Sequence, residues 1–468
     1  KGRLAARSGL GAVMGSKKLK AVVLDGRKRI GVHDRREVHR LSARCNRWVR
    51  TQLPLGPGTL MGLLGALLRV MPTVMAMDGY VYKNILRKWG TGGLNQMSPE
   101  WGDSPIKNWK GSNVDWPMRK SRSAHPDLVR RHEVFKYHCY ACPLGCGGIC
   151  EYPGLGRGHK PEYETVLALG GLCMNEDTKS LFELNEYLNR AGMDTISAGS
   201  TVAFAMECYE QGILTKDDLG GLELSWGNSA AMKELLRMMV ERKGIGDTLA
   251  DGVRVASAKI GKGSEKYAIH AGGQEPAMHD GRMDPGFALH YSVEPAPGRH
   301  TIGSQLYYEM FQLWKRVKGL PRMLPFQIYT KSSRYVPDET KARKAYACST
   351  YMSVVNGAGI CMFGAFLGVT RTPTFDWLNA VTGWNKTPED YMEIGLRIQT
   401  TRQAFNIRHG IDPATTTLHD RAVGRPPQLE GANRGRTVPI ERMMSDYWRQ
   451  MGWDASTGRP LADTLARL

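Results

Sequence analysis

The 468-residue sequence has no long apolar run, no internal repeat and no low-complexity tract. Its most apolar stretch, residues 60–77, is interrupted by Arg69 and Pro72. It falls short of the ~20 apolar residues that a membrane-spanning helix needs. We therefore predict no membrane span, and a buried or interface helix at this stretch. The sequence also shows no signal peptide, and together with its unpaired cysteines this predicts a cytoplasmic protein.

Cysteines are few, and their odd number, nine, excludes a disulfide-knotted fold. Acidic residues are also scarce: 45 Asp and Glu stand against 64 Lys and Arg, which gives a net charge of +19. Such an excess favours acidic partners. There is no block of Lys and Arg, no zinc finger and no RNA-binding signature. We therefore do not expect nucleic acid as a partner.

Four of the cysteines form an informative pattern. Cys139, Cys142 and Cys146 make a C-x2-C-x3-C run among Pro and Gly residues, which keep the backbone in turns, and Cys361 stands far downstream. Three thiolates in one loop with a distant fourth are typical of an iron–sulfur cluster. A cluster indicates electron transfer, and hence a redox enzyme. For such an enzyme, an acidic electron-carrier protein fits the positive charge best.

Two other interpretations of this pattern stay open. Zinc also binds four cysteines, although its sites usually pair C-x2-C with another closely spaced pair, and the thiols could be unligated. Among the remaining cysteines, Cys45, Cys208 and Cys348 lie in apolar, helical-looking surroundings and are predicted to be buried small hydrophobes. Cys150 and Cys173 lie near the run and are harder to assign.

Apolar periodicity predicts a mainly helical chain of two or three domains. At the N-terminus, the glycines of residues 8–15 argue against a helix, and residues 19–26 alternate like a strand. The basic stretch 101–131 is predicted to be irregular, and the Gly/Pro-rich stretch 272–303 to be dominated by loops. The predicted helices cover residues 178–191, 202–214, 230–243, 248–260, 307–317, 391–405 and 440–451.

Several segments, taken in order along the chain, carry a family resemblance. They are residues 7–21 (RSGLGAVMGSKKLKA), the cysteine run, residues 161–165 (PEYET), residues 192–197 (GMDTIS), residues 402–408 (RQAFNIR) and Trp453-Asp454. With these segments the sequence resembles the tungsten-containing aldehyde:ferredoxin oxidoreductase family over essentially the whole chain.

The resemblance implies a mainly α fold with two largely helical C-terminal domains and a remnant of an N-terminal β domain. We expect residues 1–35 to be the tail of that β domain, which covers the pterins in the family. Residues 36–267 should form a helical domain that contains the cysteine loop and the first pterin motif. Residues 268–468 should form a second helical domain that contains the second pterin motif and Cys361. The sequence starts without methionine inside a motif, so we expect it to be part of a longer chain.

The resemblance also implies a tungsten (or molybdenum) bis-pterin cofactor beside one 4Fe–4S cluster held by the four cysteines. Two family motifs of the form D-x-x-G-L-(D/C) have counterparts at residues 189–194 and 356–361, and both begin with Asn. An amide keeps an acceptor oxygen but lacks the charge that strengthens a bond to a pterin amine. Without the resemblance, Asn-x-x-Gly would be read as a helix C-cap. The implied cofactor-binding residues are Arg7, Gly9, Gly11, Asn189, Asp194, Asn356, Ile360 and Met362.

Some family members bridge a dimer with a metal held by an E-x-x-H pair. The matching helix here reads Glu183-Leu184-Asn185-Glu186 and has no histidine. We therefore predict no such metal and interpret the two glutamates as solvated surface carboxylates. A homodimer remains compatible with the resemblance.

Glu164 and His300 match the acid–base residues of the family. Glu164 heads the apolar run 166–169, where burial would raise its pKa, although it could equally be a helix N-terminal glutamate stabilised by the dipole. His300 lies in a loop, where a lone histidine is usually solvated. His279 and Asp280 lie in the same Gly/Pro-rich region and are expected to line the pocket.

The implied reaction is the two-electron oxidation of a small-molecule aldehyde to a carboxylic acid. His300 would polarise the aldehyde oxygen while Glu164 accepts a proton, and electrons would leave through the cluster to an acidic ferredoxin or iron–sulfur subunit. One alternative is an aryl-CoA reductase-like subunit, which reduces an aromatic acyl thioester. That relative places a cysteine metal ligand where this chain has residues 161–165, which argues against it. The other alternative is a non-catalytic iron–sulfur or zinc scaffold.

Overall fold

The computed structural model describes residues 4–324, 326–416 and 418–468. The fold is mainly α, as predicted, with two small antiparallel sheets among the described residues. The first half of the helices are α1 (Leu10–Ser16), α2 (Arg35–Arg50), α3 (Thr59–Val70), α4 (Gly79–Trp89), α5 (Met97–Trp101), α6 (Pro126–Arg131), α7 (Tyr163–Leu169), α8 (Thr178–Ala191), α9 (Thr195–Glu210) and α10 (Ser229–Glu241). The second half are α11 (Ile245–Leu249), α12 (Val253–Ile260), α13 (Pro285–Val293), α14 (Gln305–Phe311), α15 (Glu339–Gly357), α16 (Met362–Ala365), α17 (Thr374–Thr382), α18 (Pro388–Arg408), α19 (Ile440–Gln450) and α20 (Ala462–Arg467).

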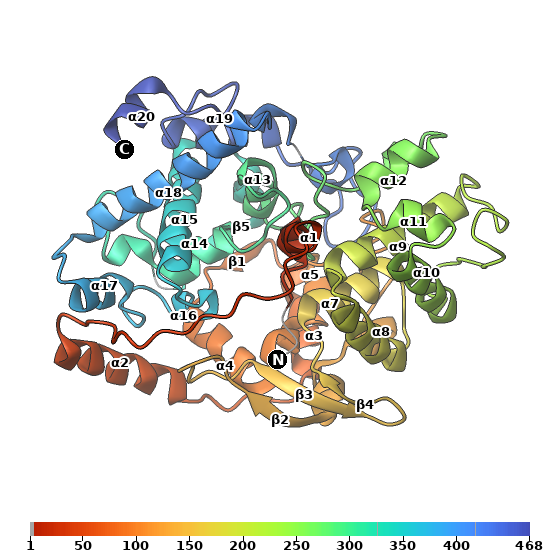
Figure 1. Ribbon diagram of the computed structural model, residues 1–468, viewed down its shortest axis with the longest axis horizontal. Helices are drawn as coiled ribbons and strands as arrows, with labels where there is room; N and C mark the ends of the chain where they lie inside the picture. Colours follow the sequence, from red (N-terminus) through yellow and green to blue (C-terminus); the bar gives the residue numbers. More distant parts are fainter. Residues whose placement is uncertain (1–3, 325, 417) are drawn as a thin grey trace.

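The helices form two groups around a shared core. Figure 1 shows α7 to α12 on one side and α13 to α18 on the other, with α1 in front between them. One hydrophobic cluster joins both groups, since it includes Leu167 and Phe204 from the first and Tyr351 from the second. A site between the two groups would therefore rest on rigid, packed elements from both.

The two sheets connect distant parts of the chain. Strand β1 (Thr73–Met75) pairs with β5 (Ile328–Thr330), so that Val74 lies opposite Tyr329. Strands β2 (Glu133–Tyr137), β3 (Gly147–Tyr152) and β4 (Gly156–His159) form a meander. The loop between β2 and β3 carries the cysteine run. Helix α2 packs on α17, and with the β1–β5 pair these contacts join segments on both sides of the predicted boundary at residue 267.

Local sequence signals explain the helices that were predicted best. Helix α8 spans the predicted residues, because Leu181, Leu184 and Leu188 give it one buried face. Asp177 caps its N-terminus through the Lys179 N–H, and Gly192 follows it with a φ of 77°, a conformation that glycine adopts without strain. Helix α18 starts with a capping box and a proline in its first turn.

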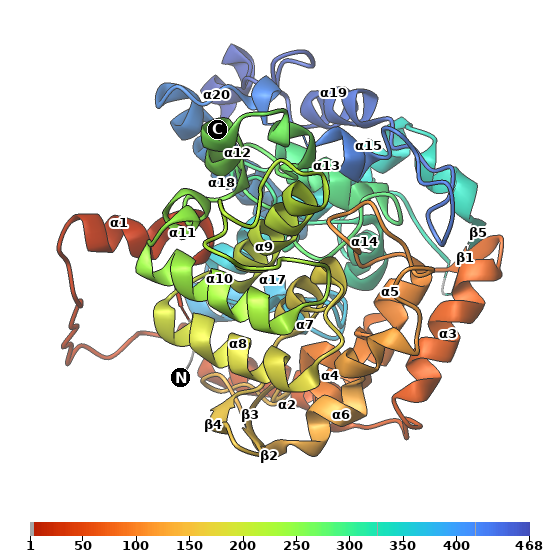
Figure 2. The same ribbon diagram turned by 90° about the vertical axis from the view of Figure 1, so that its right-hand side faces the viewer.

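The N-terminal prediction is wrong in both halves. Residues 10–16 form helix α1, although Gly11 and Gly15 lie within it. Glycine costs a helix only about 1 kcal/mol per residue relative to alanine, and the Gly11 N–H bonds to the Ala5 carbonyl, which extends the turn before the helix. Residues 19–26 are extended but pair with no strand in the part of the chain that the structure describes. Figure 2 shows this segment looping away from the body of the molecule.

Helix α3 is not the buried helix that was one prediction for residues 60–77. It packs through Gly62 and Gly65, which let Met118 and Met97 approach closely. Its leucines face outward: Leu63 and Leu67 are each 54% exposed. The alternative prediction of an interface helix stays a prediction. Within the described residues, no helix combines the length and apolarity needed to cross a membrane.

Two further differences have identifiable causes. The predicted helix over 248–260 is divided into α11 and α12, because Gly252 between them has a φ of 84°. The loop-dominated stretch 272–303 contains helix α13, which Asp284 caps and Pro285 starts. Asp-Pro is a helix-start signal that the glycine and proline content of the stretch obscured.

Candidate active site

The cysteine run forms an exposed loop between two paired strands. A turn joins the Cys142 N–H to the Cys139 carbonyl at 3.1 Å, and the Leu144 N–H donates to the Cys142 Sγ at 3.4 Å. Gly145 has a φ of 68°, and a Cβ there would collide with the His138 ring. The loop therefore needs glycine at this position to fold back on itself.

The fourth cysteine approaches this loop from the other end of the chain. Cys361 is the residue before helix α16; burial raises the pKa of its thiol, and the backbone N–H groups of Gly364 and Phe363 lower it in part. The pKa of the Cys146 thiol is raised to about 12, first by burial and then by the negative charges of Glu162, Cys361, Cys142 and Cys139. The effect of the other three thiols on Cys146 indicates that the four cysteines lie near one another. A set of four soft sulfur donors fits an iron–sulfur cluster, which would remove the protons from all four.

The remaining cysteines do not join this group. Cys45, Cys208 and Cys348 are buried, as predicted. Cys150 is buried in β3 against Val129 and Phe182. Cys173 lies beside α7 and α9, where its thiol donates to the Ala168 and Gly199 carbonyls at 3.3 Å each. These five side chains have structural surroundings.

Glu164 and His300 meet in the interior. Glu164 lies in the first turn of α7, and its Oε2 accepts from the Met278 N–H at 2.7 Å. His300 lies in the loop after α13, with its Nε2 3.4 Å from Glu164 Oε1. The side chains are only 9% and 12% exposed, so the solvated interpretation of His300 is wrong. Glu164 Oε1 and His300 Nδ1 are buried and have no hydrogen-bond partner among the described residues.

Burial acts on these two groups in opposite directions. It raises the pKa of Glu164 above its usual value, although His279 and the Met278 N–H lower it. It lowers the pKa of His300 well below its usual value, and the positive charges of His279, Arg7 and Arg299 lower it further. Both shifts favour the uncharged forms. The predicted effect of the apolar run on Glu164 is therefore confirmed in direction.

A second histidine belongs to the same cluster. His279 Nε2 is 3.9 Å from Glu164 Oε1 and 2.8 Å from the Tyr163 hydroxyl, and its Nδ1 is 3.0 Å from Asp103. Burial lowers the pKa of His279, but the carboxylates of Asp103, Glu164 and Asp284 together raise it above the usual value, with Asp103 contributing most among them. The ring stacks on Phe287 at a centroid distance of 4.4 Å. His279 is thus held in place on both nitrogens and one face.

The three groups Glu164, His279 and His300 also resemble a metal-binding triad, because one ligand atom of each lies within 4.8 Å of the others. However, both ring nitrogens of His279 are already engaged, by Asp103 and by Tyr163. A metal would have to displace one of these bonds. The arrangement is therefore better suited to holding and moving protons than to binding a metal ion directly.

An apolar cavity of about 60 Å³ adjoins this cluster. Tyr163 and His279 line it, and they contact Glu164 and His300 as well. Met362 and Phe363, the two residues after Cys361, also line the cavity. The cavity therefore reaches from the acid–base cluster to helix α16, which Cys361 precedes. Its remaining walls are mostly aromatic and methionine side chains: Tyr82, Trp101, Phe287, Tyr307, Met310 and Phe366.

Two of the predicted cofactor-binding residues meet directly. Arg7 Nη1 donates to Asp194 Oδ2 at 2.9 Å, while its Nη2 donates to the carbonyls of Glu275 and Gly298. Asp194 also caps α9 through the Ser197 N–H. Arg7 therefore joins the N-terminal segment, the first Asn-x-x-Gly motif and the His300 loop. Gly9 and Gly11 follow it at the start of α1, half-buried and exposed.

The two Asn-x-x-Gly motifs are helix C-caps of the same form. The Gly192 N–H bonds to the Asn189 carbonyl at 3.3 Å, and the Gly359 N–H bonds to the Asn356 carbonyl at 3.2 Å. The Asn189 amide reaches only Asn185, at 3.3 Å, within the described residues. The Asn356 amide is exposed and makes no hydrogen bond to a described residue. Both amides thus remain available to a ligand, and their shared role at a pterin stays a prediction.

Two other expectations have opposite outcomes. Glu183 and Glu186 are ion-paired, with Lys233 and with Arg190, as surface carboxylates commonly are. Asp280 does not line the cavity. It forms a buried ion pair with Arg282 at 2.6 Å, so the expectation that it lines the pocket is wrong.

Sequence reasoning missed Asp103 as a site residue. It follows Gly102 in the stretch predicted to be irregular, and 176 positions separate it from His279. Asp103 is fixed by the Ser98 hydroxyl at 3.0 Å. No local pattern links it to the histidine, and only the fold shows the pair.

The family model described as aldehyde ferredoxin oxidoreductase, domains 2 and 3, matches residues 73–468. The chain is 30% identical over 467 residues to a tungsten-containing aldehyde ferredoxin oxidoreductase of Thermococcus kodakarensis, covering 99% of this chain and 69% of the relative. A protein of the same name from Pyrococcus furiosus is 30% identical over 454 residues, covering 96% and 67%.

More distant relatives have other activities. An aliphatic sulfonate oxidoreductase, WOR-like subunit, of Pyrococcus furiosus is 27% identical over 481 residues, covering 98% of this chain and 65% of the relative. Among solved structures, the active site complex BamBC of benzoyl coenzyme A reductase with 1,5-dienoyl-CoA is similar, with a TM-score of 0.73 and 22% identity over 98% of this chain and 69% of that one. The latter similarity shows a shared fold.

Proposed function

Because the chain belongs to the aldehyde ferredoxin oxidoreductase family, we propose that it is an oxidoreductase that converts an aldehyde to a carboxylic acid and passes the electrons to an iron–sulfur protein. The observation that carries the proposal is the buried pair of Glu164 and His300. Each has a polar atom without a hydrogen-bond partner among the described residues, Glu164 Oε1 and His300 Nδ1. Buried polar atoms are rarely left unpaired unless a ligand or a catalytic role explains them.

The reaction defines what these residues must do. An aldehyde and one water become a carboxylic acid, two protons and two electrons. An iron–sulfur carrier accepts the electrons one at a time but does not take the protons. A residue beside the substrate must therefore accept protons during turnover, and general acid–base catalysis of this kind is typically worth ~10²–10⁴-fold in rate.

Glu164 is the proton acceptor in this proposal. Its pKa is raised by burial, which brings its proton affinity closer to neutrality than that of an exposed glutamate. His300 is neutral, because its pKa is lowered well below the usual value. A neutral imidazole can donate one N–H to a carbonyl oxygen and accept at its other nitrogen. His300 therefore polarises the aldehyde, while Nε2 faces Glu164.

His279 and Asp103 act as a positioning and proton-relay pair. Asp103 favours the protonated form of His279, so the ring donates to Asp103 and toward the Tyr163 oxygen. The positive charge then lies 3.9 Å from Glu164 and favours its ionised form. A proton taken up by Glu164 has His300 and His279 as polar neighbours, with their Nε2 atoms 3.4 and 3.9 Å from Oε1, and His279 in turn contacts Tyr163. His279 and Tyr163 form part of the wall of the apolar cavity, and this cavity would hold the apolar part of the substrate.

The cofactors follow from the family and from the donor sets. Cys139, Cys142, Cys146 and Cys361 would hold a 4Fe–4S cluster. A tungsten (or molybdenum) bis-pterin, when bound, would supply the two-electron oxidation. Its binding residues would be drawn from the N-terminal segment and the two Asn-x-x-Gly caps: Arg7, Gly9, Gly11, Asn189, Asp194, Asn356, Ile360 and Met362.

The test is a turnover assay on the full-length protein, produced anaerobically with tungstate or molybdate. Aldehydes with apolar aliphatic and aromatic tails are supplied with a viologen dye as electron acceptor. We expect dye reduction together with the matching carboxylic acid, at two dye molecules per acid. A metal-loaded protein that reduces no dye with any aldehyde would contradict the proposal.

A second candidate is reduction of an aromatic acyl thioester, which the aromatic walls of the cavity would also suit. Residues 161–165 contain no cysteine, which counts against it. The same protein assayed with benzoyl-CoA and a low-potential reductant distinguishes the two. Formation of a dienoyl product would favour the reductase. A protein that binds only zinc would favour a non-catalytic scaffold.

A further inference from the structure

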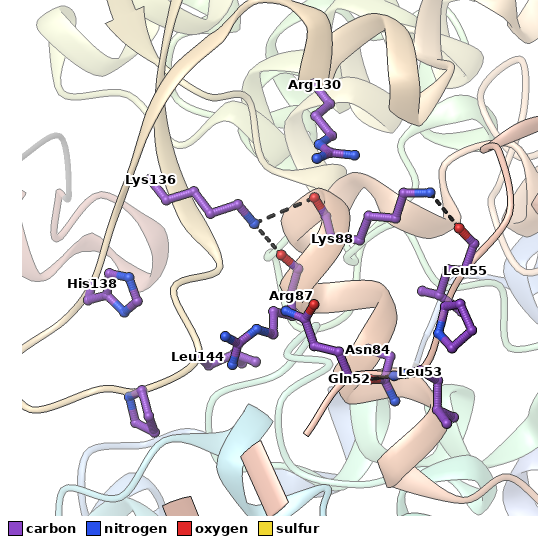
Figure 3. Close-up of a pocket in the computed structure, with 12 residues that line it drawn as sticks. Gln52, Leu53, Leu55, Asn84, Arg87, Lys88, Arg130, Lys136, His138 and Leu144 are labelled. Carbon is purple, nitrogen blue, oxygen red and sulfur yellow. Dashed lines mark hydrogen bonds between the residues drawn. The ribbon is translucent and has the colours of Figure 1, made fainter. Parts of the chain in front are cut away.

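A large basic cavity lies beside the cysteine loop. It has a volume of about 470 Å³, and His138, Pro143 and Leu144 of the loop form part of its wall. No lining residue is acidic. The basic side chains at its wall are Arg87, Lys88, Arg130 and Lys136 (Figure 3).

Within the described residues, the basic side chains of this cavity form no ion pair with a carboxylate. Lys136 donates to the Arg87 carbonyl, and Lys88 donates to the Leu55 and Gly56 carbonyls at 2.8 and 2.7 Å. Arg130 has no hydrogen-bond or ion-pair partner there, and Figure 3 shows it pointing toward Lys136 and Lys88. Burial lowers the pKa of Lys136; Glu133 counteracts this, but the like charges of Lys160, Arg130 and Arg87 lower the pKa further.

The nearby carboxylates already have partners. Glu133 binds Lys160 at 2.5 Å, in a pair whose side chains are both less than 10% exposed. Asp127 accepts from the Trp89 indole N–H and from the Gly58 N–H, both at 2.6 Å. Glu133 also raises the pKa of Lys136 and so offsets part of the positive charge, but among the described residues only these two carboxylates face the four basic side chains of the cavity wall. The cavity therefore has a net positive potential that only an external group can satisfy.

Helix α2 extends this positive surface. Cys45 and Val49 on its buried face share an apolar cluster with Leu86 and Leu144, so the helix adjoins the cysteine loop. Its single acidic residue is Glu37, which is bound by Arg40. The exposed arginines of the helix are Arg35, Arg36, Arg40, Arg44, Arg47 and Arg50.

The loop itself is accessible. Cys139 is exposed, and the neighbouring Tyr140 side chain is 103% exposed. An electron carrier must bring its redox centre close to the cluster, because electron tunnelling falls steeply with distance. A protein that docks over Tyr140 would satisfy this requirement and would at the same time cover the cavity and the end of α2.

We propose that the basic cavity and the arginine face of α2 form the docking site of an acidic iron–sulfur electron carrier, with a carboxylate of the carrier entering the cavity. The inference rests on the proposed function, since it requires a cluster in the cysteine loop. A protein partner fits better than a small anion. The lysine ammonium groups are held by backbone carbonyls, so they supply a broad positive potential instead of a ring of free donors, and the positive surface continues beyond the cavity.

The test compares two charge-reversal variants of the holoenzyme. The first carries Arg50→Glu and Arg130→Glu, two exposed arginines without ion pairs at the cavity and at the end of α2. The control carries Lys216→Glu and Arg459→Glu, which are also exposed. Arg459 lies in the sequence between α19 and α20, and Figures 1 and 2 show these two helices at the opposite end of the molecule from β2 and β3. Both variants change the net charge equally.

Two readouts are used with an acidic bacterial-type ferredoxin. The first is the ratio of ferredoxin-dependent to viologen-dependent turnover, and the second is ferredoxin binding measured directly at several salt concentrations. We expect the first variant to lower the ratio about tenfold or more and to flatten the salt dependence of binding, while the control leaves both near wild type. Equal effects of the two variants would overturn the proposal.

Other outcomes are equally decisive. In one such outcome, millimolar phosphate or ATP competes for the cavity, and the first variant keeps wild-type ferredoxin kinetics. That result would identify the cavity as a small-anion site and overturn protein docking. If wild-type protein oxidises no aldehyde but still binds ferredoxin through Arg50 and Arg130, the proposed function fails while the docking site stands.

Discussion

His300 Nε2 lies 3.4 Å from Glu164 Oε1, and both groups are buried where their uncharged forms are favoured. The distance is too long for a strong hydrogen bond but short enough for one proton to matter to both groups. Each also leaves one buried polar atom unpaired among the described residues. The pair is therefore a ready acceptor and donor for a ligand that completes it.

Replacing Glu164 with glutamine should lower kcat by ~10²–10⁴-fold, because the amide keeps the shape and removes the proton acceptor. The amide oxygen can still accept from the Met278 N–H, so tungsten and iron content should stay unchanged. Glu176→Gln, an exposed glutamate before α8, is the matched control and should turn over normally. Undiminished kcat in Glu164→Gln with normal metal loading would show that another group takes the proton.

His300→Ala should lower kcat by a similar ~10²–10⁴-fold, since it removes the donor to the aldehyde oxygen. We expect this loss in single-turnover measurements of the oxidation step, with cluster reduction by dithionite unaffected. His409→Ala, an exposed histidine after α18, serves as control. Equal rates in the two variants would remove His300 from the reaction.

The raised pKa of Glu164 predicts a pH-dependent gain in stability for Glu164→Gln. A carboxyl with a raised folded-state pKa stabilises the protein below its unfolded pKa, near 4.5, and this contribution is lost as the pH rises through the folded value. Glutamine does not titrate. The melting temperature of Glu164→Gln minus that of wild type should therefore increase between about pH 4 and pH 8. A constant difference, measured by calorimetry at one scan rate, would contradict the burial effect.

Cys361→Ala should release or convert the cluster, because it removes one of four thiolates. We expect lower iron content and loss or change of the paramagnetic signal of the reduced cluster. Cys208→Ala removes a buried thiol on α9 and should keep the iron of the wild type. Full iron content with an unchanged signal in Cys361→Ala would place the fourth ligand elsewhere.

The sequence predicted best those parts of the fold whose helix signals, an apolar face and a capping residue, lie within one segment. Helix α8 was correct because its apolar face and the Asp177 cap lie within one segment. Helix α13 was missed because only two residues, Asp284 and Pro285, indicated a helix inside a stretch rich in glycine and proline. Helix α1 was missed because its glycines count against a helix, and no buried face in the described structure signals one.

The candidate site shows the same division. Glu164 and His300 were named from a family resemblance, and the structure brings them together. Asp103, whose carboxylate raises the pKa of His279, could not be identified from the sequence. The bond between them depends on how the stretch around α5 packs against the loop before α13, and the sequence contains no pattern for that contact.

Metal analysis of the full-length protein, purified without oxygen from cells supplied with tungstate and molybdate, tests the central claim most directly. The account predicts about four iron atoms and about one tungsten or molybdenum atom per chain, with pterin released on denaturation. Zinc in place of iron, without tungsten or molybdenum, would contradict it.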